Sequence, residues 1–242
     1  MADHRKVFLS AEWLNLVLLN YVVDPSLLRS HIPFGTSLDS FEGKTYVSLV
    51  GFRFSKTKLW RTVSVPFHTE FEEVNLRFYV RRRIGGELRR GVAFLREIVP
   101  KPAIALTARL VYGENYVWLP MKHKIIAATN HKEVEYSWEH RGNWSRLSAR
   151  SSEGATRPAE NSLEQYITEH YWGYARQTLD RTLEYHVRHS PWPVSVASEA
   201  SFSGHTSELC GSEFQAVLSG KPDSAYLSSG SPVEVYSGVV IR

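Results

Sequence analysis

The chain has 242 residues, a length at which β barrels and sandwiches often form one unit, so we expect a single domain over residues 1–242. Its composition, 43% hydrophobic and 22% charged, is typical of a globular protein and excludes a disordered chain. The formal net charge of +4 is a mild excess that is spread along the sequence, so composition does not predict a nucleic-acid-binding protein.

Cysteine usage and the start of the chain bear on location. The single cysteine, Cys210, excludes an internal disulfide framework and fits a reducing compartment. The charged segment over residues 1–10 lacks the apolar core of about 7 to 15 residues that a signal peptide needs. The longest apolar run, residues 16–19, is too short to span a bilayer. We therefore expect a cytoplasmic protein with no membrane partner.

The first part of the chain predicts strands around one short helix. Residues 13–23 are β-branched and aromatic with few polar interruptions, which is typical of a strand buried on both faces. Asp24 followed by Pro25 predicts the N-cap and first turn of a short helix over residues 26–31. Two further strands are expected over residues 36–39 and 45–55.

The stretch over residues 68–102 is the part around which the chain is organised. It predicts two strands, residues 73–81 and 91–99, joined by a glycine turn. Apolar and polar side chains alternate along the first strand, so its two faces differ in polarity. Polar groups placed this regularly inside apolar strands suggest a lined cavity. The polar face of the first strand carries Glu73, Asn75 and Arg77.

The second strand ends with two charged residues that we expect on opposite faces. Arg96 is predicted to share the face of Val92, Phe94 and Ile98, where its charge needs a partner. Glu73 or Glu97 could supply that partner. These residues form either a structural ion pair between neighbouring strands or part of a binding or catalytic site, and the pattern does not decide between the two.

Lys101 stands between Pro100 and Pro102, directly after the second strand. A lysine near arginines in an apolar cavity can have its pKa lowered enough to act as a Schiff-base nucleophile. The same position also suits an exposed lysine at the end of a strand. Both roles stay open.

Arginines gather on both sides of the predicted turn, at positions 81–83 and 89–90. Charges beside a hairpin turn ordinarily face water and protect strand ends from pairing with other chains. The alternative is a patch that binds nucleic acid or another anion. Because no aromatic-interleaved or helical recognition motif accompanies the arginines, we expect a solvated turn and no nucleic-acid partner.

The rest of the chain continues the β pattern. Ser162, with Gln165 three residues later, predicts a capped helix. A second amphipathic helix is expected over residues 208–219. The remaining strands are predicted over residues 103–112, 119–129, 133–141, 144–152, 182–188 and 233–241. The fold class is therefore mainly β (α+β), an antiparallel sheet that closes into a barrel with two or three peripheral helices.

Sequence motifs predict neither a metal site nor a cofactor. The 10 histidines form no zinc motif. There is no glycine-rich nucleotide loop, and no Gly-x-Ser-x-Gly segment of the α/β-hydrolases. The aromatic run over residues 169–174 can wall a pocket or fill a core.

Four segments carry a family resemblance: FEEVNLRFYV at residues 71–80, YVSLVGFRF at 46–54, NYVVDPSLLRSHIP at 20–33 and EHYWGY at 169–174. Together they resemble the YqjF-like conserved proteins, a domain-of-unknown-function family of the acetoacetate decarboxylase-like superfamily. The resemblance covers most of the chain. It implies a closed antiparallel β barrel with a central cavity.

The resemblance also assigns roles to residues. Glu73 matches the cavity glutamate of the decarboxylases, and the segment from Arg96 through Glu97 is similar to their Arg-Glu motif. The place of their Schiff-base lysine falls on Ala103, and the nearest amine is Lys101, two residues earlier. Two residues along a strand restore the same face, so Lys101 could substitute. Their substrate-binding arginine has no counterpart over residues 10–13.

Three classes of function follow. The preferred one is a small-molecule-binding barrel for a small organic anion, with Asn75, Arg77, Arg96 and Glu97 as binding residues. The second is a lyase that acts on a β-keto acid through a Lys101 imine, with Glu73 as the other catalytic residue. The third is a protein-interaction module with a filled core. Self-association into a homo-oligomer stays open.

Overall fold

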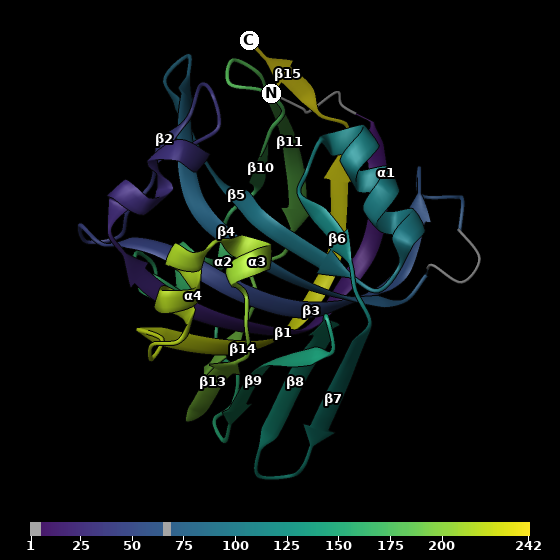
Figure 1. Cartoon of the computed structure of the whole chain (residues 1–242), viewed down its shortest axis with the longest axis vertical. Helices are drawn as coiled ribbons and strands as arrows, with labels where there is room; N and C mark the ends of the chain where they lie inside the picture. Colours follow the sequence, from purple (N-terminus) through teal and green to yellow (C-terminus); the bar gives the residue numbers. More distant parts are fainter. Residues whose placement is uncertain (1–5, 65–68) are drawn as a thin grey trace.

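The computed structural model describes residues 6–64 and 69–242, apart from the side chains at positions 110–112. The described chain is mainly β, as predicted, and holds two sheets and few helices (Figure 1). The 11-stranded sheet contains β1 (Val7–Val23), β2 (Ser37–Leu38), β3 (Thr45–Leu59), β4 (Phe71–Ile84), β5 (Glu87–Val99), β6 (Tyr116–Trp118), β10 (Trp172–Arg176), β11 (Thr182–His189), β12 (Val194–Val196), β14 (Ser224–Tyr236) and β15 (Val239–Ile241). The 4-stranded sheet contains β7 (Met121–Ala127), β8 (Lys132–His140), β9 (Asn143–Ser151) and β13 (Glu199–Ser203).

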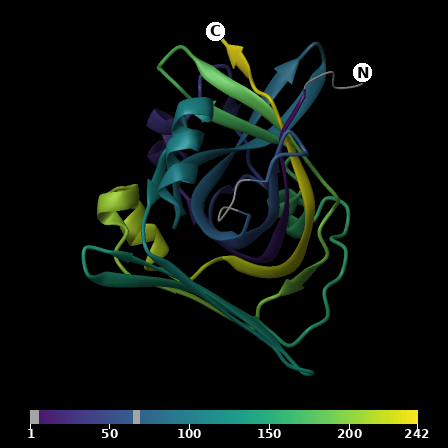
Figure 2. The same cartoon turned by 90° about the vertical axis from the view of Figure 1, so that its right-hand side faces the viewer.

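The strand order positions the interior of the large sheet. Pairing runs β12-β14-β1-β3-β4-β5-β10-β11-β15, and β11 also pairs with β14. The pairings therefore lead from β14 around to β11 and back to β14, and Figure 2 shows this sheet curving around an interior. Most pairs are antiparallel, but β5 pairs in parallel with β10 and with β6. The small sheet lies along one outer side of the large sheet (Figures 1 and 2).

The alternation predicted for residues 73–81 is confirmed in β4. Val74, Leu76, Phe78 and Val80 pack into a core cluster together with side chains of the small sheet. The opposite face of β4 points to the interior of the large sheet, and its polar residues Glu73, Asn75 and Arg77 are also buried, whereas Arg81 at the end of the pattern is exposed. Water does not reach the three buried residues freely, so each of their polar groups needs a partner inside the molecule.

Residues 103–112 form a helix, so the prediction of a strand there was wrong. The helix α1 (Pro102–Tyr112) begins with proline in its first turn and ends at Gly113, which has a φ of 71°. Proline suits the first turn because its missing N–H would be unpaired there in any case. Ala103, Ile104, Thr107 and Ala108 lie on one helix face that borders the interior of the large sheet, and Ala103 and Thr107 are also exposed to solvent.

A β-bulge changes which side chains of β5 face inward. Leu76 pairs with Arg96, whereas the next residue of β4, Arg77, pairs with Phe94, so Leu95 is the extra residue. Phe94 and Glu97 consequently both face the interior, and Ile98 packs on the outer side. Arg96 therefore shares the outer face with Ile98, as predicted, but not the inner face of Val92 and Phe94, because the prediction assumed an unbroken alternation.

The other helices are short and peripheral. The 3-10 helix η1 (Pro25–His31) is capped by Asp24, as predicted, and Ser162 caps α2 (Leu163–Thr168) through Gln165. The helix predicted over residues 208–219 is divided at Gly211 into α3 (Ser207–Cys210) and α4 (Ser212–Leu218). No helix in the described part of the chain is long and apolar enough to cross a membrane. The charged start at residues 1–5 and the first position of the polar stretch, His68, lie outside the described residues.

Candidate functional site

A pocket of about 210 Å³ lies against the inner face of the large sheet and is bordered by α1. Its walls are largely apolar, so a bound molecule would lose most of its contact with water there. The aromatic residues among the lining are Phe8, Trp13, Phe52, Phe54, Phe71, Phe94, Tyr116, Trp172, Tyr185 and Trp192.

The pocket brings together some of the predicted site residues and leaves out others. Glu73, Asn75, Arg77 and Glu97 line it. Arg96 and Lys101 are not among its lining residues.

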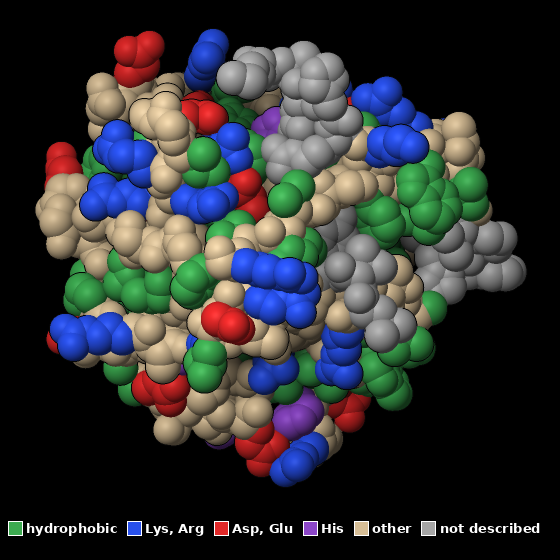
Figure 3. All heavy atoms as spheres, turned by 90° about the horizontal axis from the view of Figure 1, so that it is seen from above, with side chains coloured by type: hydrophobic (Ala, Val, Ile, Leu, Met, Phe, Trp, Pro, Cys, Tyr) green, Lys and Arg blue, Asp and Glu red, His purple; other side chains and the backbone are tan. Residues whose placement is uncertain are grey.

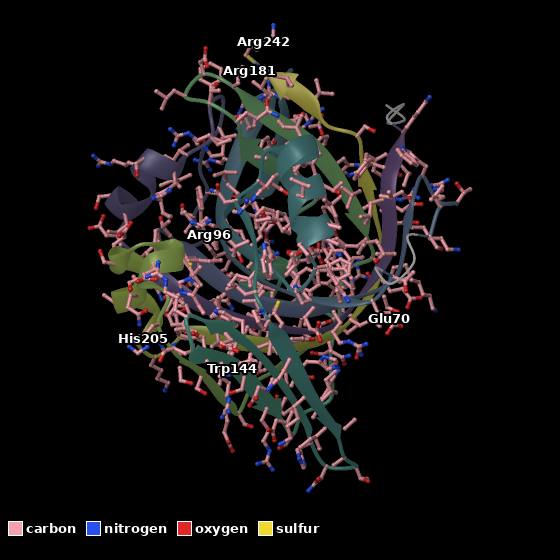
Figure 4. The ribbon with its side chains drawn as sticks, turned by 45° about the vertical axis from the view of Figure 1, so that its right-hand side comes forward. Glu70, Arg96, Trp144, Arg181, His205 and Arg242 are labelled. Atoms are coloured by element: carbon pink, nitrogen blue, oxygen red, sulfur yellow. The ribbon has the colours of Figure 1, made fainter. Side chains whose placement is uncertain are left out.

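Arg96 lies on the outer face of the large sheet, where its Nε donates to the carbonyl oxygen of Leu209 in α3 (Figure 4). Lys101 is the N-cap residue of α1, and its side chain makes no cap hydrogen bond. Ala103, where the resemblance places the reactive amine of the decarboxylases, does line the pocket. The pocket thus contains the position of the amine without an amine, since no lysine occurs among the described lining residues.

Glu73 is held by two donors inside the pocket. The Asn75 side-chain amide donates to its Oε1 at 2.9 Å, and the Tyr116 hydroxyl donates to its Oε2 at 3.1 Å. The residue is only 3% exposed. Burial, which disfavours the charged carboxylate, raises the pKa of Glu73 to about 7 despite these donors.

Two more glutamates accompany Glu73. Glu97 pairs with Asn75 across β4 and β5, is 1% exposed, and its Oε2 has no hydrogen-bond partner among the described residues. Burial, and then the nearby charges of Glu114 and Glu73, raise its pKa well above the usual range. Glu114, between α1 and β6, accepts a hydrogen bond from the Tyr185 hydroxyl, and burial raises its pKa to about 8. The three carboxyl groups therefore form one coupled acidic cluster.

Arg77 is the cation of the pocket. It is 9% exposed; one terminal nitrogen donates to the carbonyl oxygen of Ile167 at 3.1 Å, and its Nε has no partner among the described residues. No carboxylate of the described residues lies within ion-pairing distance of its guanidinium. Glu73 is nevertheless near enough for the positive charge of Arg77 to act against the rise of its pKa. A buried guanidinium without a bound carboxylate is costly, so Arg77 is suited to receive an anion.

His170 lies next to Arg77. Its ring packs on Tyr79 and Tyr166, with centroid distances of 4.7 and 5.4 Å, and it is 7% exposed. Neither ring nitrogen has a hydrogen-bond partner within the described part of the chain. Burial, and then the positive charge of Arg77, lower its pKa well below the usual value, so the ring is neutral at pH 7. A neutral imidazole can donate one hydrogen bond to a ligand and accept another.

The sequence patterns did not identify several of these residues. Glu114, Tyr116 and Tyr185 reach the pocket from separate elements, and only the fold brings them beside Glu73. His170 belongs to the aromatic run over residues 169–174, for which a pocket wall was one of the two expectations. Of that run, His170, Trp172 and Gly173 line the pocket.

Four of the five arginines beside the β4–β5 turn are engaged in ion pairs. Arg82 and Arg89 both bind the buried carboxylate of Glu184, at 3.0 and 2.7 Å. Arg81 and Arg90 flank the buried Asp39, at 3.7 and 3.3 Å. Figure 3 shows basic side chains mixed with acidic and apolar ones on the face it presents. These contacts favour the structural role of the arginines over an anion patch.

Among the described residues, no group of three His, Cys, Asp or Glu side chains is placed to hold a metal ion.

Comparison with known proteins gives a family and a fold. The DUF2071 family model, described as an uncharacterized conserved protein, matches residues 10–232. A curated relative is the uncharacterized protein YqjF of Bacillus subtilis strain 168, which is 25% identical over 203 residues that cover 80% of this chain and 77% of YqjF.

Several solved structures share the fold at low identity. The acetoacetate decarboxylase of Legionella pneumophila matches with a TM-score of 0.68 and 12% identity, over 97% of this chain and 87% of that one. The enduracididine biosynthesis enzyme MppR complexed with pyruvate matches with a TM-score of 0.71 and 11% identity, over 100% of this chain and 92% of that one. An acetoacetate decarboxylase-like enzyme from Sphingomonas wittichii RW1 matches with a TM-score of 0.67 and 11% identity, over 97% of this chain and 92% of that one. The chain therefore has the fold of the acetoacetate decarboxylase-like proteins.

Proposed function

Because the chain belongs to the DUF2071 family of uncharacterized conserved proteins, we propose its function from its pocket: the protein binds a small organic anion there, with the anionic group against Arg77 and His170. The observation that carries the proposal is the buried guanidinium of Arg77, which has a backbone carbonyl as its partner and no bound carboxylate among the described residues. A ligand carboxylate would supply the negative charge that Arg77 lacks and would accept a hydrogen bond from its unpaired Nε–H.

The surroundings support a small and partly apolar ligand. The volume of about 210 Å³ and the aromatic walls suit a compact molecule rather than a polymer. One of the proteins with this fold, MppR, is complexed with pyruvate, a small carboxylate. A protein-interaction module with a filled core would not need such a pocket, so we do not favour that class.

We propose further that the large sheet acts as a closed barrel, that residues 1–242 form one domain, and that the protein is cytoplasmic. The return of the strand pairing from β11 to β14 supports closure, and the single family match over residues 10–232 supports one domain. The lone Cys210, whose thiol pKa burial raises to about 12, fits a reducing compartment.

Replacing Arg77 with glutamine is expected to weaken the binding of small carboxylates about thirtyfold, because one charge-assisted hydrogen-bond pair is lost. Isothermal titration calorimetry with pyruvate, benzoate and 4-methylbenzoate measures this. Arg96→Gln is the matched control, since Arg96 also donates to a backbone carbonyl but lies outside the pocket lining. If both variants bind as wild type does, or if no carboxylate of the panel binds, the proposal is wrong.

A lyase that works through a lysine imine is the second candidate, and the acetoacetate decarboxylases with this fold are what favour it. Borohydride reduction in the presence of acetoacetate is expected to leave no adduct on Lys101, because this lysine is not among the pocket-lining residues. The matched control is Ala103→Lys, which places an amine at a position that does line the pocket. Mass spectrometry of tryptic peptides reads out both proteins. An adduct on wild-type Lys101 would establish the imine route.

A further inference from the structure

The anion proposed above uses one end of the polar lining and leaves the other unused. The unused end is the acidic cluster of Glu73, Glu97 and Glu114, which come from β4, from β5 and from the segment between α1 and β6. Against these three acids, Arg77 is the only lysine or arginine among the described residues of the lining. A pocket meant for an anion alone would not need an acidic cluster, because like charges repel.

When its carboxyl groups are ionised, as they would be beside a cationic ligand, the cluster also has more hydrogen-bond acceptors than donors. The Tyr116 hydroxyl donates to Glu73, and the Tyr185 hydroxyl donates to Glu114. Two buried oxygens, Oε2 of Glu97 and Oδ1 of Asn75, then lack a partner among the described residues. An unpaired buried acceptor costs free energy that a donor from a ligand can recover.

The two polar ends lie apart on one strand face. Glu73 and Arg77 are four residues apart on β4, and an extended strand rises about 3.4 Å per residue, so their Cα atoms are about 14 Å apart. Both side chains line the same pocket. A single small molecule can therefore contact both ends while its middle lies against the aromatic walls.

We propose that the ligand is dipolar: besides the anionic group at Arg77 it carries a basic nitrogen whose N–H groups are held by Glu73, Glu97 and Glu114. The inference rests on the proposed function and specifies its ligand class. The class is that of carboxylic acids with an apolar body and an ammonium, amidinium or imidazolium group at the far end. Such a group supplies donors to Glu97 and Asn75 and opposes the charge of the cluster.

Binding of such a ligand has a consequence for protons. In the protein by itself, burial raises the pKa of all three glutamates, so the cluster holds protons near pH 7. The charged groups that act on the cluster are its own carboxyl groups, Arg77 near Glu73 and Arg96 near Glu97, while Tyr116 and Tyr185 act as donors. A cationic nitrogen favours the ionised carboxylates, so each carboxylic acid that ionises gives its proton to the buffer on binding.

The test compares matched pairs of ligands on the full chain. 4-(Aminomethyl)benzoate is compared with 4-methylbenzoate, and 4-(2-aminoethyl)benzoate with 4-ethylbenzoate, so that two nitrogen positions are sampled. In at least one pair the amine is expected to bind about tenfold tighter. Calorimetry at pH 7 in buffers of different ionisation enthalpy is expected to show proton release for that amine.

Variants separate the cluster from general effects. Glu97→Gln keeps the shape of the side chain but removes its charge, and it is expected to abolish most of the advantage of the amine. Glu153→Gln, in the exposed segment after β9, is expected to leave the advantage unchanged.

Three other outcomes overturn the inference. If the methyl and ethyl acids bind but neither amine binds tighter, the ligand is not dipolar while the proposed anion binding stands. If the amine binds tighter equally in wild type and Glu97→Gln, the cluster does not hold the nitrogen. If none of the four acids binds, the proposed function and this inference fail together.

Discussion

Replacing Gly230 with alanine is expected to lower the free energy of unfolding by about 3 kcal/mol, the sum of a left-handed backbone penalty and a steric conflict. Gly230 in β14 has a φ of +86°, and a Cβ there would lie 1.8 Å from the carbonyl oxygen of Trp13. That oxygen belongs to the backbone of β1, which pairs with β14 over most of its length. No side-chain rotation can relieve the conflict, so the two strands must separate locally. Urea denaturation measures the change.

Gly142→Ala provides the matched control for the backbone penalty. Gly142 has a φ of +80°, and no atom lies within 4 Å of a Cβ built there. Its replacement is expected to cost only about 1 kcal/mol, the penalty of placing a side chain in the left-handed region. Equal losses for the two variants would show that the close approach of β1 and β14 is not what requires glycine at position 230.

The free energy of unfolding is expected to fall as the pH rises from 6.5 to about 8, because of the acidic cluster. Glu73 has a pKa of about 7 in the folded protein against 4.5 for a free side chain, and burial raises the pKa of Glu114 to about 8. A raised folded-state pKa means that the stability is fully present below pH 4.5 and is lost as the pH rises through the folded-state value. Between pH 4.5 and about 7, Glu73 alone lowers the free energy of unfolding by an amount on the order of 3 kcal/mol.

His170 acts in the opposite direction at lower pH. Its pKa is lowered well below 6.5 by burial, so the unfolded state takes up a proton that the folded state does not, and stability is lost as the pH falls below 6.5. The effects of the glutamates and of His170 therefore oppose each other between pH 4.5 and 6.5. Above pH 6.5 the glutamates act without it.

Urea denaturation of wild type and of the double variant Glu73→Gln/Glu114→Gln at several pH values tests this expectation. Glutamine cannot ionise, so the double variant should lose much less stability between pH 6.5 and 8 than wild type does. Glu153→Gln, at an exposed position, should follow wild type. A wild-type stability that is constant or rises across this interval would contradict the raised pKa values of the cluster.

Local patterns predicted the parts of the fold that depend on neighbouring residues. The alternation along β4 identified its two faces correctly, because period-two alternation is a property of the strand itself. Asp24 and Ser162 cap helices as predicted, because capping is completed within a few residues. The same reasoning correctly placed Glu73, Asn75 and Arg77 on one buried face.

The errors come from features that depend on tertiary partners. Alanine, leucine and β-branched residues over 103–112 fit a strand or a helix, and packing of one helix face against the pocket accompanies the helix that forms. The bulge at Leu95 is visible only in the register between β4 and β5. Regular alternation puts Phe94 and Glu97 on opposite faces, so the sequence could not predict that both face the pocket while Arg96 faces outward. Glu114 reaches the pocket from a distant segment whose sequence contains no motif for it, and the aromatic run that includes His170 fitted either a pocket wall or a filled core until the fold was known.

The pairing of β1 with β14 has a consequence for synthesis of the protein on the ribosome. β1 begins at Val7, but its partner β14 extends to Tyr236, so a nascent chain exposes one hydrogen-bonding edge of β1 until β14 has emerged. An open strand edge is a template for aggregation, and non-local pairing is slow. The pocket, whose lining includes both Trp13 and Val235, likewise forms only after nearly the whole chain has been translated. We therefore expect the unpaired edge of β1 to be the part of the nascent chain most open to aggregation until β14 is complete.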